Sequence, residues 1–123
     1  MKHAQLLSVA FTGVLVGIFT VAAPFAQPKG ERVTVTGEVV EMWCYLEAGD
    51  RGAAKKVCAT ACAKAGNPMA LVDDRGELFL LAGLQSHQPA QELLLDKMSE
   101  RVTVTGTLVK NPKAQMIYIE SVR

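Results

Sequence analysis

The chain has 123 residues and a formal net charge of +1, with 13 basic residues against 12 acidic ones. This near-neutral balance excludes the strongly basic surface that supplies most of the affinity of proteins for nucleic acids. Aromatic residues make up only 6% of the chain, too few for a platform on which bases stack, and we therefore expect no nucleic-acid partner.

The first 26 residues predict a segment that directs the chain into or across a membrane. A basic start at Lys2 precedes an uncharged apolar run over residues 6–23, which is the layout of a secretory signal. The run is also close to the roughly 20 residues that span a bilayer. We expect residues 1–26 to be a signal peptide or an uncleaved membrane anchor. Residues 27–123 then form a single exported domain, periplasmic or secreted, which contacts a membrane only if the anchor is retained.

The hexapeptide RVTVTG occurs twice, at residues 32–37 and 101–106. Valine alternates with threonine in both copies, and successive side chains of a strand point to opposite faces. We therefore predict two half-buried strands of one sheet. The alternation assigns one pair of side chains to the core, Val35 and Val104, and another pair to the solvent, Thr34 and Thr103.

Three further strands and a helix are predicted from the rest of the domain. Apolar residues 69–72 and 77–81 flank the turn sequence DDRG and indicate a β-hairpin. Residues 115–122 follow an Asn-Pro turn and alternate again, which predicts the last strand. Before the second hexapeptide, a proline suited to a first helical position and an apolar stripe predict a helix. These helical residues are Pro89, Leu93, Leu94 and Met98.

The order of these elements matches the OB-fold, a five-stranded Greek-key barrel. We predict a mainly β domain: a five-stranded OB-fold-like barrel with a cysteine-containing helical insertion between strands 1 and 2. A second helix lies between strands 3 and 4. Another small barrel, or an open sheet with two helices, is the alternative.

All three cysteines lie in the insertion. Alanines and cysteines recur there at three- and four-residue intervals and end at Gly66, which predicts a helix over residues 53–65. Cys58 and Cys62 then stack one turn apart on one face of this helix. That spacing suits joint ligation of a metal but disfavours a disulfide between the two, whereas a bridge from Cys44 is easier.

The direction of the strands predicts which other residues meet the cysteines. In an antiparallel arrangement the end of strand 1, the start of strand 2 and the exit of strand 3 lie at one end of the barrel. We therefore predict a metal site made of Cys44, Cys58, Cys62 and His87, with copper or zinc as the candidate ion. Met69 begins strand 2 and is assigned to the core rather than to the site.

Two other roles fit the same cysteines. In an exported protein, one bridge from Cys44 and one buried free thiol can simply stabilise an OB-fold ligand-binding module. A reactive odd thiol would instead make the chain a thiol redox protein. The sequence contains no Cys-x-x-Cys, no phosphate-binding loop and no nucleophile elbow, and it indicates no catalytic residue. The leading hypothesis is a non-enzymatic domain that binds a metal ion or a protein partner through the cysteines.

Three short segments resemble a group of small exported bacterial proteins. They are GEVVEMWCY at residues 37–45, CATAC at 58–62 and GNP at 66–68. Proteins of this group have an OB-like barrel and no established activity. The resemblance therefore implies a fold and a compartment but no reaction.

Overall fold

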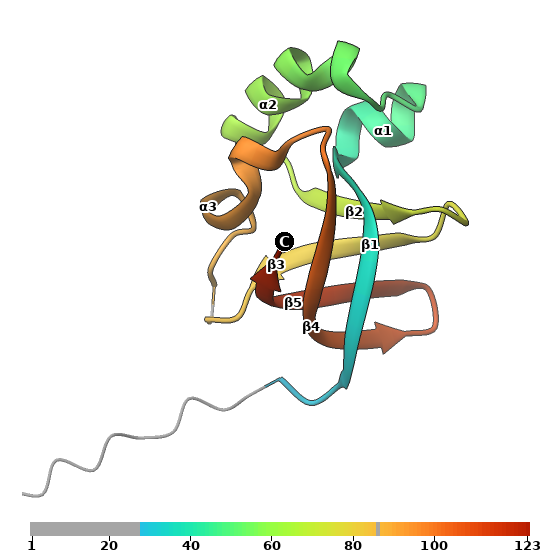
Figure 1. Cartoon of the computed structure of the whole chain (residues 1–123), viewed down its shortest axis with the longest axis vertical. Coiled ribbons are helices and arrows are strands. Elements are labelled where there is room, and N and C mark those ends of the chain that lie inside the picture. The colour runs from blue at the N-terminus through green and yellow to red at the C-terminus, as the bar shows by residue number, and fades with distance from the viewer. Residues whose placement is uncertain (1–27, 86) are drawn as a thin grey trace, which may run out of the picture.

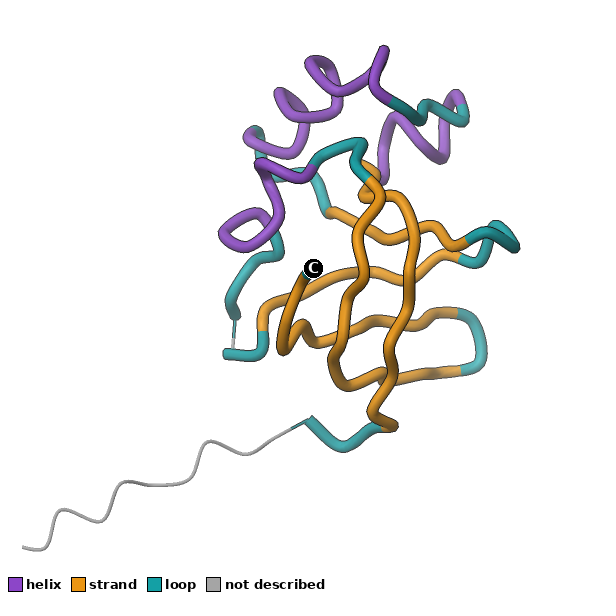
Figure 2. The backbone as a smooth tube through the Cα atoms, viewed as in Figure 1, coloured by secondary structure: helices purple, strands orange, loops and turns teal. Residues whose placement is uncertain are grey.

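The computed structural model describes residues 28–85 and 87–123, so the predictions for residues 1–26 lie outside the described part. Five strands close into a barrel in the order β1–β2–β3–β5–β4 (Figures 1 and 2). The strands are β1 Glu31–Glu41, β2 Met69–Asp73, β3 Leu78–Gly83, β4 Arg101–Asn111 and β5 Ala114–Val122. Neighbouring strands are antiparallel except β3 and β5, which are parallel. The predicted OB-fold-like barrel is confirmed.

Helices occupy the two long connections. The β1–β2 connection contains α1 Met42–Ala48, the 3-10 turn η1 Ala53–Lys55 and α2 Lys56–Lys64, and the β3–β4 connection contains α3 Gln91–Leu94 and η2 Leu95–Lys97. The predicted helix over 53–65 is therefore present as η1 and α2, whereas α1 was not predicted. Figure 1 shows α1 and α2 together at the end of the barrel where β1 finishes. Within the described residues, no helix combines the length and the hydropathy needed to cross a membrane.

The two copies of the hexapeptide pair with each other. Val35 lies opposite Val104 in the antiparallel β1–β4 ladder, and equivalent pairs extend symmetrically on both sides. Val104 is fully buried and Val35 packs against the same core. On the outer face, threonine hydroxyls bond across the strands, at 3.0 Å for Thr34 and Thr105 and at 2.8 Å for Thr36 and Thr103. The predicted strand register is confirmed.

The barrel interior holds one large apolar cluster that the helices help to close. Two alanines of α2, Ala59 and Ala63, are buried against it, and Leu94 and Met98 seal the opening beside α3. Leu93 was predicted to belong to this stripe, but it is 38% exposed. The reason is that α3 is a single turn, which has only one inward position.

A smaller apolar cluster lies on the outer face of β1 and β2. Val40, Ala70 and Val72 are buried there. Met42 and Tyr45 of α1 pack over them, because α1 begins directly where β1 ends and folds back across the sheet. This contact fixes the position of α1 and hence of Cys44.

Candidate metal centre

Cys44 lies in the first turn of α1, and Glu41 anchors this turn. Glu41 is the last residue of β1 and is only 1% exposed. Its carboxylate accepts hydrogen bonds from the backbone N–H groups of Trp43, at 2.7 Å, and of Cys44, at 2.9 Å. The first N–H groups of a helix have no partner within the helix, so this cap satisfies two of them. The carboxylate thereby holds the backbone of Cys44 in place.

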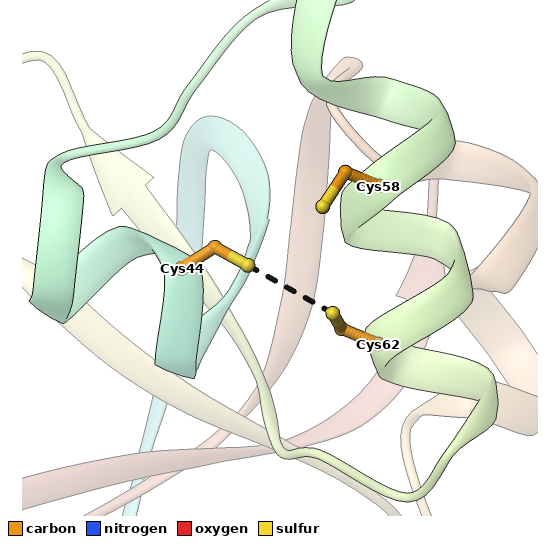
Figure 3. A group of neighbouring side chains, drawn as sticks. All are labelled: Cys44, Cys58 and Cys62. Atoms are coloured by element: carbon orange, nitrogen blue, oxygen red, sulfur yellow. Dashed lines mark hydrogen bonds between the residues drawn. The ribbon is translucent and has the colours of Figure 1, made fainter.

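Cys58 and Cys62 are presented by α2. Each stands immediately before one of the two buried alanines, Ala59 and Ala63, which attach α2 to the core. Because residues four apart lie above one another on a helix, this attachment turns both thiols to one side. Figure 3 shows that this side faces Cys44 of α1. The helix ends at Lys64, and Gly66 reverses the chain with a φ of 105°.

The three sulfur atoms converge at one point between the helices. All three Sγ atoms lie within 4.8 Å of one another, and the Cys44 thiol is 3.9 Å from the sulfur of Cys62 (Figure 3). No disulfide joins them, so all three are free thiols. Cys44 and Cys62 are partly covered, whereas Cys58 is exposed to solvent.

These separations match the size of a thiolate-bound ion. Zinc–sulfur bonds are about 2.3 Å long, so three sulfurs around one ion lie roughly 3.8 Å apart in tetrahedral geometry and about 4.0 Å apart in trigonal geometry. The observed 3.9 Å between Cys44 and Cys62 lies between these values. Cys58 is at most 4.8 Å from either sulfur and needs only a small side-chain movement. The cluster is therefore close to the geometry that metal binding requires.

Glu41 also controls the protonation of Cys44. Burial by itself raises the pKa of the Glu41 carboxyl. Hydrogen bonds from the backbone and thiol of Cys44, the backbone of Trp43 and the side chain of Asn67 outweigh burial and hold this pKa below its usual range. The carboxylate in turn raises the pKa of the Cys44 thiol to about 12, through a side-chain hydrogen bond first and then burial and the neighbouring Cys62. Cys44 is thus a protonated, weakly nucleophilic thiol at neutral pH.

A cation stands near the sulfurs. Lys55 of η1 forms an ion pair with Asp50 at 2.9 Å. The pKa of its ammonium group is raised, first by the hydrogen bond and charge of Asp50 and then by the nearby Cys58 and Cys44. Lys55 is therefore a cation beside the cluster whose charge is already paired with that of Asp50.

The structure brings together three of the four residues predicted for the metal site. His87 lies in the connection after β3, is exposed, and has a left-handed backbone with a φ of 62°. It is not a member of the cluster of mutually close ligand atoms. The reason is that β3 runs on for three residues beyond its last pairing with β2, through Leu81 to Gly83, and pairs there with β5. This extension carries the chain away from α1 and α2.

Two other residues complete the comparison with the sequence. Met69 pairs with Glu41 at the start of β2 and is 1% exposed, as its assignment to the core predicted. Glu41 was not predicted to take part in the site. Glutamate is not among the preferred N-cap residues, so no local signal marked the start of α1.

Comparison of the chain with protein-family models, with curated proteins and with solved structures found no match.

Proposed function

We propose that this chain is a small exported domain that binds one soft metal ion, Cu(I) or Zn(II), through Cys44, Cys58 and Cys62. The observation that carries the proposal is the convergence of three free thiols, all within 4.8 Å of one another, from two separately anchored helices. The apolar run over residues 6–23 supports export.

The chemistry of the donors limits the choice of ion. Thiolates are soft ligands that suit Cu(I) and Zn(II), whereas Mg²⁺ and Ca²⁺ require oxygen ligands. Zinc sites have four ligands, so a bound Zn(II) would take its fourth from solvent or a partner at the exposed Cys58 side. Ligation also displaces the thiol proton, and the raised pKa of Cys44, about 12, makes binding weaken as the pH falls.

Metal titration of the reduced protein under nitrogen tests the proposal. We expect one Cu(I) or one Zn(II) per chain in competition with a chelator of known affinity. Each of Cys44→Ser, Cys58→Ser and Cys62→Ser should weaken binding, and Cys44→Ser should do so most, because it removes the one thiol that α1 contributes. Thr60→Ala, on α2 between the two cysteines, is the matched control. Binding that is absent, or unchanged in Cys44→Ser, would refute a three-thiolate site.

A thiol redox function is the second candidate, and the 3.9 Å between the sulfurs of Cys44 and Cys62 favours it. An S–S bond of about 2.05 Å needs only an approach of the two helices. In that reaction both thiols lose their protons, and two electrons reduce an external disulfide to two thiols. Intact-mass analysis after alkylation separates the candidates: the oxidised chain leaves one reactive thiol, Cys58, whereas the reduced chain freed of metal leaves three.

A further inference from the structure

The outer face of β3 is apolar where a solvated barrel face would be polar. The strand reads LFLLAG without a polar side chain. Phe79 and Leu81 point into the core and are buried, whereas Leu78 and Leu80 point outward and are half-buried. Met116 of β5 pairs with Leu80 and is also half-buried. Antiparallel sheets normally carry polar residues on the face that contacts water, so this face has the composition of a surface that is covered.

The residues that the structure describes cover only part of this face. Met42 and Tyr45 of α1, together with Leu78, close the neighbouring apolar patch on β1 and β2. These side chains do not extend past Leu78. A groove of about 510 Å³ opens there between Met42, the outward-facing leucines of β3 and the β4–β5 turn. A smaller groove of about 270 Å³ adjoins it and continues along Leu80 and Met116.

The rim of the groove is positively charged. Lys110, near the end of β4, and Lys113, in the β4–β5 turn, line the groove. Both are exposed, and neither forms an ion pair with any residue that the structure describes. Glu77 lines the same groove, but its carboxylate is engaged, by Gln115 at 2.8 Å and by Arg75 at 3.4 Å. Two cations therefore stand beside an apolar floor.

We propose that this groove is a second binding site, for an amphipathic organic anion with an unbranched apolar chain and a carboxylate head. The apolar chain would lie on Leu78, Leu80 and Met116, and the carboxylate would bond the ammonium groups of Lys110 and Lys113. The volume lies in the range of small-molecule pockets, which combine apolar walls with a few polar groups that fix orientation. Among the described residues, none that line the groove is aromatic, so the floor offers no ring on which a nucleobase stacks, and this favours an acyl chain over a nucleotide.

Titration with monomeric decanoate, followed by methyl NMR shifts and calorimetry, tests this site. We expect shifts at Leu78, Leu80 and Met116. The double variant Lys110→Gln/Lys113→Gln should weaken binding about tenfold or more, because charge-assisted hydrogen bonds are lost. The control Lys29→Gln/Lys64→Gln removes two lysines that do not line the groove and should leave binding unchanged.

Three results would overturn the proposal. The first is that decanol binds as tightly as decanoate. The second is that the control variant loses as much decanoate affinity as the Lys110→Gln/Lys113→Gln variant. The third is that the methyl NMR shifts fall outside the groove or occur only above the micelle concentration of decanoate. Cys44→Ser should retain decanoate binding. This variant separates the two proposals experimentally, because a protein without metal binding can still bind decanoate, and the reverse.

Discussion

The β1–β4 ladder and the α1–α2 segment are built on opposite plans. The ladder joins eight residue pairs of two long strands, and its central Val104 is completely buried. The α1–α2 segment is held by the buried carboxylate of Glu41, by the packing of Met42 and Tyr45, and by two small side chains of α2. The ion pair of Lys56 with Glu100 adds to these contacts. The segment leaves Trp43 65% and Val57 85% exposed. The difference teaches that the barrel supplies most of the stability of this domain. The candidate metal ligands lie instead in the α1–α2 segment, a surface layer that few contacts attach to the barrel.

The largest effect that this comparison predicts is the loss of folding in Val104→Asp. The substitution places an unpaired charge in the barrel core and should destabilise the protein by about 4 kcal/mol or more. Urea unfolding followed by circular dichroism measures it. Val35→Asp should cost less, because Val35 is only half-buried. Thr34→Asp, on the exposed face of the same strand, is the control, and a loss equal to that of Val104→Asp would mean that the strand faces are exchanged.

The second effect concerns the attachment of the surface layer. Glu41→Ala removes the cap of α1 and should lower the free energy of unfolding by about 1–2 kcal/mol. It should also weaken metal binding, because Glu41 orients the backbone of Cys44, but by less than the usual cost of about 10- to 100-fold for losing an orienting group. The reason is that the carboxylate also keeps the Cys44 thiol protonated, so its removal favours the thiolate. Glu47→Ala is the matched control. Glu47 lies on the same helix and, among the residues that the structure describes, accepts a side-chain hydrogen bond only from the exposed indole of Trp43, at 3.0 Å. If the two variants bind metal equally, Glu41 does not position Cys44.

A smaller effect on stability is expected for Cys58, the most exposed of the three cysteines. Cys58 is exposed, so Cys58→Ser should change the free energy of unfolding by no more than about 0.5 kcal/mol. The same variant should lose metal affinity, which separates function from folding in this layer. Thermal unfolding of the reduced, metal-free protein measures the first quantity. A large destabilisation would show that Cys58 contributes to packing rather than to a ligand set.

The smallest effect is predicted for an exposed ion pair that ties the β2–β3 turn to β4. Arg101 donates two hydrogen bonds of 2.6 Å to Asp74, and this pairing lowers the pKa of the Asp74 carboxyl. A lowered folded-state pKa adds stability above the unfolded pKa of about 3.9, and this is lost as the pH falls through the folded value. The unfolding midpoints of wild type and Asp74→Asn should thus differ slightly at pH 7 and converge in acid. A difference that persists in acid would assign the effect to something other than this charge.

The barrel was predictable because its signals are local. Alternation in the two hexapeptides, the turn between residues 72 and 77, and the apolar stripes each depend on neighbours in the sequence. The same holds for the helix that presents Cys58 and Cys62, because their spacing of four residues matches one helical turn. The OB-fold-like barrel followed from the order of the elements, since few topologies accommodate five such strands with these connections.

The composition of the site was decided only by the tertiary structure. The sequence by itself determined that two thiols share one helix face, and it allowed Cys44 to approach them. Whether Cys44 comes within 3.9 Å of Cys62 depends on the cap at Glu41 and on how α1 packs over the barrel. His87 was expected at the same end from strand direction alone. The extended pairing of β3 with β5 moves its connection elsewhere, because distances in a closed barrel depend on the tilt and stagger of its strands, which no local pattern encodes.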